Sequence, residues 1–202
     1  MPNWCATDIS INCNNKDKLN KLYSNLLDWT SKNFVDSDFG NNWLGNIVGF
    51  SGISDPLSEE SPRCRGYITA INEPSEDQLY IQTETAWCPM VNMWIQVCDK
   101  YLGKDEYDIE YVAEEPGCGL YLTNDPALSG SYYVEPSCEE GVDPIIEYSE
   151  YELNKENLIN YIQKALNTTE TDFSKLEEQF NKLDVKPFYY SEWVYKDIYN
   201  LD

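Results

Sequence analysis

The chain has 202 residues, of which 36 are acidic and 14 are basic, so its formal net charge is -22. It contains no histidine, which excludes a Ser-His-Asp triad, a Cys-His catalytic pair and imidazole-ligated zinc. The negative charge disfavours direct binding of nucleic acid or of an anionic membrane, and the aromatic content of 14% predicts a folded chain with a core.

The N-terminal part of the chain alternates between strand and helix patterns. Apolar and polar residues alternate from Cys5 to Cys13, which predicts a half-buried strand. Leucines at helical spacing from Asp17 to Trp29 predict an amphipathic helix, and the apolar run from Trp43 to Phe50 predicts a further strand. The stretches Arg65–Ile71 and Leu79–Trp87 flank a turn-rich segment, which is typical of a β-hairpin.

The middle of the chain contains the clearest helix pattern, followed by short strands. Pro89 suits the first position of a helix, and an unbroken apolar stripe continues from there to Leu102. Alternation predicts a strand from Tyr107 to Ala113. Shorter strands are predicted over Gly119–Thr123, Ser131–Glu135 and Ile145–Tyr151.

The order strand, helix, hairpin, helix, strand predicts an α+β fold of the ferredoxin-like type, with two helices on one face of an antiparallel sheet and an extra β-hairpin. The C-terminal part is helical in pattern, with apolar stripes over Leu158–Leu166 and Phe173–Leu183. Ser174 and Glu177 have the spacing of a capping box. We therefore expect a ferredoxin-like domain at residues 1–151 and a helical and aromatic extension at residues 152–202 packed on it.

The seven cysteines form no recognisable framework. Their number is odd and no two are spaced as Cys-x-x-Cys, so we expect free thiols, with no metal and no cofactor. Cys5 and Cys88 would be nucleophiles only beside a cation or a helix N-terminus, and we favour structural burial for both. No apolar run approaches the ~18 residues of a membrane span, so we expect a soluble protein of the cytoplasm.

Separated motifs in this chain resemble a known family. They are the opening Met1–Cys5, then Thr85–Pro89 leading into Trp94, then Ile109–Tyr111 and Glu115–Gly119. Together they resemble the YubB-like family of phage and plasmid proteins, which have a ferredoxin-like domain. The resemblance ends before the C-terminal extension. It implies an origin in a mobile element and a fold, and it assigns no catalytic residue because the family has no established activity.

Acidic residues are concentrated in one quarter of the chain. Residues 105–154 contain 14 acids and neither Lys nor Arg. If this segment has a proportional surface of about 2,400 Å², it carries one charge per roughly 170 Å², against about 110 Å² for duplex DNA. The acids expected to bind a partner are Asp105, Glu106, Asp108, Glu110, Glu114, Glu115, Asp125, Glu135, Glu139, Glu140, Asp143, Glu147, Glu150 and Glu152. The competing interpretation is a solvated face that only keeps the protein soluble.

These observations favour a non-enzymatic accessory protein of a phage or mobile element that acts in the cytoplasm of a bacterial host. Its acidic surface would bind a basic, nucleic-acid-binding defence protein, such as a restriction or CRISPR nuclease, and inhibit it as a DNA mimic. The chain would then be an anti-restriction or anti-CRISPR protein. The alternative is a small-ligand binder or an enzyme that uses a cleft between the sheet and the C-terminal extension.

Overall fold

The computed structural model of the protein describes residues 3–35, 38–139 and 141–201, and the chain divides into two compact units. Unit 1 comprises Met1–Asp125 and Lys196–Asp202, and unit 2 comprises Pro126–Tyr195. The last residues of the chain therefore belong to the same unit as the first. The boundary that we expected at residue 151 lies inside unit 2, because strands on both sides of it pair within that unit.

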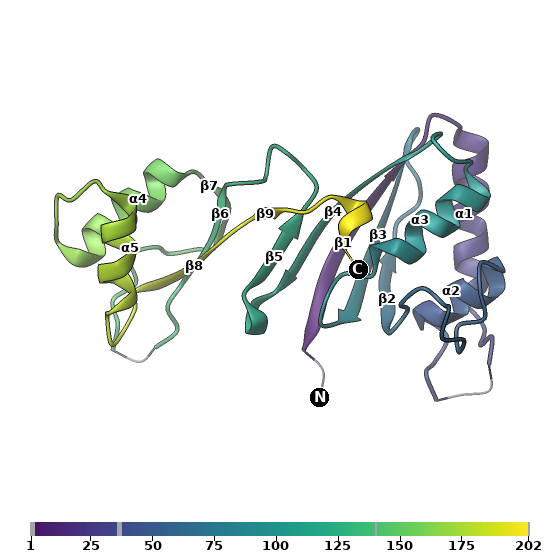
Figure 1. Cartoon of the computed structure of the whole chain (residues 1–202), viewed down its shortest axis with the longest axis horizontal. Helices are drawn as coiled ribbons and strands as arrows, with labels where there is room; N and C mark the ends of the chain where they lie inside the picture. Colours follow the sequence, from purple (N-terminus) through teal and green to yellow (C-terminus); the bar gives the residue numbers. More distant parts are fainter. Residues whose placement is uncertain (1–2, 36–37, 140, 202) are drawn as a thin grey trace. The chain divides into compact units, whose positions relative to one another are not determined.

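Unit 1 combines helices with an antiparallel sheet, and its three α-helices lie on one side of that sheet (Figure 1). Its strands are β1 (Trp4–Asn12), β2 (Gly66–Ile71), β3 (Gln78–Ala86), β4 (Asp108–Glu115) and β5 (Leu120–Thr123). Its helices are α1 (Lys16–Trp29), α2 (Leu44–Ser51) and α3 (Val91–Tyr101), with short 3₁₀ helices η1 (Pro116–Cys118) and η2 (Ile198–Asn200). The strands are ordered β2-β3-β1-β4-β5, and each neighbouring pair is antiparallel.

The core of unit 1 lies between this sheet and the helices. Alternation buries one face of each central strand, and the register places Ile9 of β1 between Ile81 of β3 and Tyr111 of β4. The apolar stripe of α3 packs onto this row. One buried cluster contains residues of both layers, among them Ile9, Ile11, Ile81, Met93, Trp94 and Val97.

The segment from Trp43 to Phe50 is a helix, so the predicted strand is wrong there. Trp43 precedes α2, which runs from Leu44 to Ser51 and is buried on almost every side. A helix that is apolar all round shows no helical period, and a short apolar run cannot be distinguished from a buried strand. The side chain of Asn46 makes this burial possible, because its amide accepts from Phe34 N at 2.9 Å and donates to two backbone carbonyls.

Unit 2 has a small sheet, two helices and its own core. Its strands are β6 (Tyr132–Pro136), β7 (Glu150–Leu153), β8 (Phe188–Glu192) and the two-residue β9 (Val194–Tyr195), and its helices are α4 (Lys155–Leu166) and α5 (Phe173–Asn181). The sheet order is β7-β6-β8, and both pairs are antiparallel. A second buried cluster, separate from that of unit 1, contains Val134, Leu158, Leu176, Phe180 and Phe188.

Two predicted features of unit 2 differ from the structure. The predicted strand over Ile145–Tyr151 begins only at Glu150, because Ile146 enters the core from a loop instead of alternating along a strand. The capping box predicted at Ser174 is also wrong. Asp172 caps α5, because its carboxylate accepts from the backbone N–H groups of Ser174 and Lys175.

Candidate acidic binding site

The solvent-facing side of the unit 1 sheet presents carboxylates on three adjacent strands. Alternation along β1, β3 and β4 points one set of side chains toward the helices and the other set away from them. The outward set includes Asp8, Glu84, Asp108, Glu110 and Glu114, which we name the acidic face. None of the strands β1 to β5 contains a Lys or an Arg.

The strand register spaces these carboxylates regularly. Ala6 of the central strand β1 lies between Glu84 of β3 and Glu114 of β4. Ser10 of β1 lies opposite Glu110 of β4. Adjacent strands are about 4.8 Å apart, and alternate residues on one strand are about 6.8 Å apart. Ala6 and Ser10 of β1 therefore lie beside these glutamates, and Asp8 lies between the two on the same strand.

Four ion pairs in the described part of the chain lie outside the acidic face. Among the described residues, ion pairs join Lys18 to Glu106, Lys32 to Asp28, Lys175 to Glu170 and Lys182 to Glu178. None of these pairs includes a residue of the acidic face. Asp8 instead accepts a hydrogen bond from Gln82 Nε2 at 2.8 Å. Burial, together with a hydrogen bond to Asp8, raises the pKa of Tyr80 to about 12. Asp8 is thus engaged by two uncharged donors, Gln82 and Tyr80, of the neighbouring strand.

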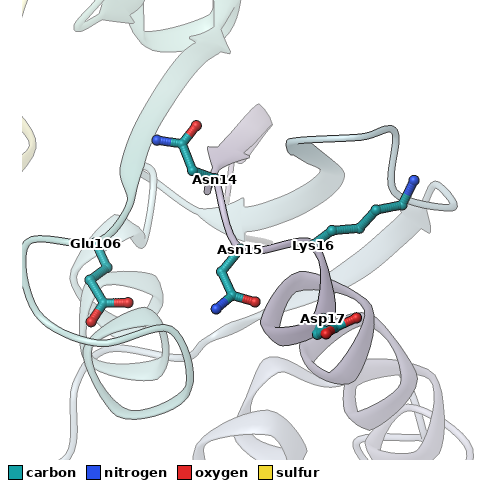
Figure 2. Close-up of a pocket in the computed structure, with 5 residues that line it drawn as sticks. All are labelled: Asn14, Asn15, Lys16, Asp17 and Glu106. Carbon is teal, nitrogen blue, oxygen red and sulfur yellow. The ribbon is translucent and has the colours of Figure 1, made fainter.

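The acidic face continues into an open hollow at the end of the sheet where β1 finishes and β4 begins. One part of it, of about 440 Å³, is lined by Asn14, Asn15, Lys16, Asp17 and Glu106 (Figure 2). The adjoining part, of about 300 Å³, shares Asn14 and Glu106 and is also lined by Asn12, Cys13, Asp77, Asp105, Tyr107 and Asp108. We name these two parts together the acidic hollow. Asp108 belongs to both the acidic face and the acidic hollow.

Two loops build the acidic hollow. In the loop before α1, the Asn15 side chain accepts from Lys18 N at 3.1 Å and so caps the helix. The loop after α3 reverses direction at Gly103 (φ +106°) and Asp105 (φ +64°). Lys18 Nζ crosses between the loops and lies 2.6 Å from Glu106 Oε2. Lys16 extends away from Glu106 (Figure 2). The hollow therefore contains one paired carboxylate beside several that form no ion pair.

The predicted partner-binding acids are divided between the two units. Unit 1 contains Asp105, Glu106, Asp108, Glu110, Glu114, Glu115 and Asp125. Unit 2 contains Glu135, Glu139, Asp143, Glu147, Glu150 and Glu152. Glu140 lies outside the described residues. In unit 1 the structure groups these acids on the acidic face and in the acidic hollow, with the exceptions of Glu115 and Asp125.

Some of the predicted acids are engaged within their own unit. Glu115 is buried on the helix side of the sheet. In unit 2, Tyr189 donates to Glu139 at 2.6 Å and Tyr161 donates to Glu150 at 2.7 Å. These hydrogen bonds raise the pKa of both tyrosines, because the phenolic proton is held by a carboxylate. The unit 2 acids therefore contribute less free carboxylate surface than their number suggests.

Sequence reasoning missed Asp8 and Glu84 on the acidic face, and Asp17 and Asp77 in the acidic hollow. All four lie outside the segment 105–154, and the strand register places Asp8 and Glu84 on the same sheet face as the acids of β4. A signal was present in the sequence, because the predicted strands of β1 and β3 also lack basic residues. Counting charges by predicted strand instead of by contiguous segment would have found Asp8 and Glu84.

The two thiols considered as nucleophiles have different surroundings. Burial raises the pKa of Cys5 to about 11, which disfavours its thiolate. Cys88 is only half-buried and has Arg63 Nη1 at 3.9 Å from its sulfur, so the cation named as a condition is present and the burial that we favoured is incomplete. Across residues 3–35, 38–139 and 141–201, no group of three or more Cys, Asp or Glu side chains is arranged to hold a metal ion.

Comparisons with protein-family models, curated proteins and solved structures find no match for this chain. In the part of the chain that the structure describes, no helix has both the length and the apolar character needed to cross a membrane. The candidate site therefore rests on geometry and charge alone.

Proposed function

We propose that this chain is a non-enzymatic accessory protein of a phage or mobile element that binds a basic, nucleic-acid-binding defence protein of a bacterial host. A restriction or CRISPR nuclease is the class of partner that fits this role, and inhibition would occur by DNA mimicry in the host cytoplasm. The observation that carries the proposal is the acidic face, where carboxylates stand on three adjacent strands of a sheet whose strands contain no Lys or Arg.

The mechanism is competition for phosphate-binding side chains. A nuclease holds the DNA backbone with Lys and Arg, and carboxylates at regular spacing offer the same side chains an alternative set of anions. Strands hold these carboxylates on a rigid backbone, so less conformational entropy is lost when a partner binds. Because the attraction is ionic, the complex should dissociate as the salt concentration rises.

We also propose a ferredoxin-like classification for unit 1. If α2 is set aside, the elements from β1 to β4 follow the order β-α-β-β-α-β. The spatial order β2-β3-β1-β4, with every pair antiparallel, also supports this classification. Together with the motifs that resemble the YubB-like family, it supports an origin in a mobile element.

The absence of histidine from the sequence and the raised pKa of Cys5 support a non-enzymatic role. A general acid or base active near neutral pH is usually a histidine or a carboxyl group with a shifted pKa. The acidic hollow is open and polar, in contrast to the enclosed and mainly apolar pockets that hold small ligands.

The test is capture of the partner with a variant that changes only the acidic face. The immobilised protein is exposed to bacterial lysate at low salt, and the bound proteins are eluted with rising NaCl or with duplex DNA. We expect a nucleic-acid-binding protein to be released by both. The variant Glu84→Gln/Glu110→Gln/Glu114→Gln should lose it, because neutral amides do not attract phosphate-binding cations.

The matched control is Glu59→Gln/Glu60→Gln/Glu73→Gln, which makes the same change in net charge at exposed residues outside the strands. This control should retain the partner. Equal loss in both variants would show that net charge, not the acidic face, attracts the protein. A captured partner that duplex DNA does not displace would contradict mimicry.

A further inference from the structure

At the end of the sheet opposite to the acidic hollow, three segments that are far apart in the sequence meet. Asn3 precedes β1, Trp87 follows β3, and Glu115 is the last residue of β4. The backbone N–H of Trp87 donates to Asn3 O at 3.0 Å, and Trp4 pairs with Ala86. Asn3 Nδ2 reaches Cys118, in the turn after β4, at 3.1 Å from its sulfur. The segments thus form one structural feature.

Glu115 is the unusual residue of this feature. Its side chain is 4% exposed, and Oε2 is the buried side-chain polar atom that has no hydrogen-bond partner among the described residues. Burial of a carboxylate oxygen without a donor is destabilising, and in native structures such an atom is usually paired with protein, water or an ion. A donor from outside the chain would satisfy it.

An exposed turn lies against this carboxylate. Residues Pro116 to Gly119 are exposed, and a Cβ added at Gly117 would lie 2.8 Å from Glu115 Oε1. The turn therefore lies directly against the carboxylate, and glycine is needed for this approach. A hydrogen bond to Glu115 raises the pKa of Cys118, so that its thiol stays neutral. The residues of this turn carry no positive charge that would compete with an incoming cation for Glu115.

An exposed indole lies at the same end of the sheet. Trp87 is 50% exposed and has φ +73°, a left-handed backbone conformation that non-glycine residues seldom adopt. Backbone conformations of this kind are frequent at ligand-binding sites. An indole face attracts ammonium and guanidinium groups, and a carboxylate accepts hydrogen bonds from the same groups.

We propose that Glu115 anchors one Lys or Arg side chain of the basic partner, which reaches Oε2 when the Pro116–Gly119 turn moves aside and which Trp87 contacts from solvent. This inference rests on the proposed function for the nature of the partner. It concerns a separate site, because Glu115 points to the helix side of the sheet and belongs to neither the acidic face nor the acidic hollow.

The probe is a synthetic peptide of alternating glycine and arginine, and its control has citrulline in place of arginine, which keeps N–H donors but removes the charge. We expect Glu115→Gln to bind the arginine peptide roughly tenfold more weakly in calorimetry, the size of one charge-assisted hydrogen bond. Glu73→Gln, which removes one exposed carboxylate elsewhere, should bind like the parent chain.

The melting temperature without peptide gives an independent readout. Because Glu115→Gln removes a buried carboxylate whose Oε2 has no hydrogen-bond partner among the described residues, it should leave the melting temperature unchanged or raise it. A melting temperature lowered by the substitution would show that the carboxylate is structural and would overturn the proposal. Unchanged peptide affinity would overturn it as well.

A second measurement uses the unaltered chain. Arginine peptide, but not citrulline peptide, should change the alkylation rate of Cys118 by iodoacetamide and leave that of the exposed Cys138 constant. An equal effect on both thiols would contradict a movement of this turn. If the acidic-face triple variant loses the peptide while Glu115→Gln retains it, this inference fails and the proposed function stands. The reverse result rejects the acidic face and retains the Glu115 site.

Discussion

At the scale of single residues, Trp94 tests whether the core of unit 1 is built as described. Its side chain is 1% exposed and packs in the cluster between α3 and the sheet. Trp94→Ala should lower the free energy of unfolding by about 3–5 kcal/mol, because a large cavity remains. Urea titration measures this loss, and Leu57→Ala, at a residue that is 63% exposed, should change the value by less than about 0.5 kcal/mol. A loss below about 1 kcal/mol for Trp94→Ala would contradict its burial.

Two buried thiols predict how stability depends on alkaline pH. Burial raises the pKa of both Cys5 and Cys64 to about 11, from an ordinary value near 9. Each contributes stability that is fully present below the unfolded pKa and is lost as pH rises through the folded pKa, since only the unfolded chain ionises readily. The free energy of unfolding should therefore fall between about pH 9 and 11.

The variant Cys5→Ala/Cys64→Ala separates these thiols from other groups. Its free energy of unfolding should fall less steeply over the same pH interval, with the remaining slope due to Cys98, whose pKa burial also raises, and to tyrosines such as Tyr80. Urea titrations at a series of pH values provide the comparison. Identical slopes for the variant and the parent chain would show that the two thiols ionise normally in the folded state.

At the scale of elements, substitutions at the start of α5 distinguish the observed N-cap, Asp172, from the predicted one, Ser174. The Asp172 carboxylate accepts from two backbone N–H groups of the first turn. Asp172→Ala should therefore destabilise unit 2 by about 1 kcal/mol, within the range of roughly 0.5–2 kcal/mol for lost N-caps. Ser174→Ala should change stability by less than about 0.5 kcal/mol, because Ser174 lies inside the helix. Chemical denaturation monitored by circular dichroism tests both, and a larger effect of Ser174→Ala would restore the predicted capping box.

At the scale of the whole molecule, the net charge of -22 predicts a strong response to salt. Four ion pairs among the described residues cannot balance 36 acids, so like charges repel one another in the folded state. Raising NaCl from about 0.01 M to about 0.15 M shortens the Debye length from about 30 Å to about 8 Å. The melting temperature should rise over this interval in differential scanning calorimetry.

The variant Glu84→Gln/Glu110→Gln/Glu114→Gln tests whether the acidic face contributes to this dependence of the melting temperature on salt. With three fewer carboxylates on one surface, its melting temperature should depend less on NaCl than that of the control triple variant with the same net charge. A melting temperature that stays constant or falls with added NaCl would show that the acids of the folded chain do not repel one another appreciably.

Local periodicity was sufficient to predict much of unit 1 from the sequence. The strand at Trp4–Asn12, the helix at Lys16–Trp29 and the apolar stripe of α3 each follow a pattern that lies within one segment. The spacing of apolar residues also indicates which face of a strand or helix is buried. The burial of Ile9 and Trp94 could therefore be predicted from the sequence. Composition alone also predicts that a charged partner would be basic, which stays a prediction.

The rest of the fold and of the candidate site depends on pairing between segments that are far apart in the sequence. β6 pairs with β8, more than fifty residues later, so unit 2 begins well before the boundary at which the helical pattern starts. The register of β1 with β3 and β4 created the acidic face from Asp8, Glu84 and Glu114. A residue's local pattern predicts which of its strand's faces it occupies, but its neighbours across the sheet depend on contacts that only the folded chain makes.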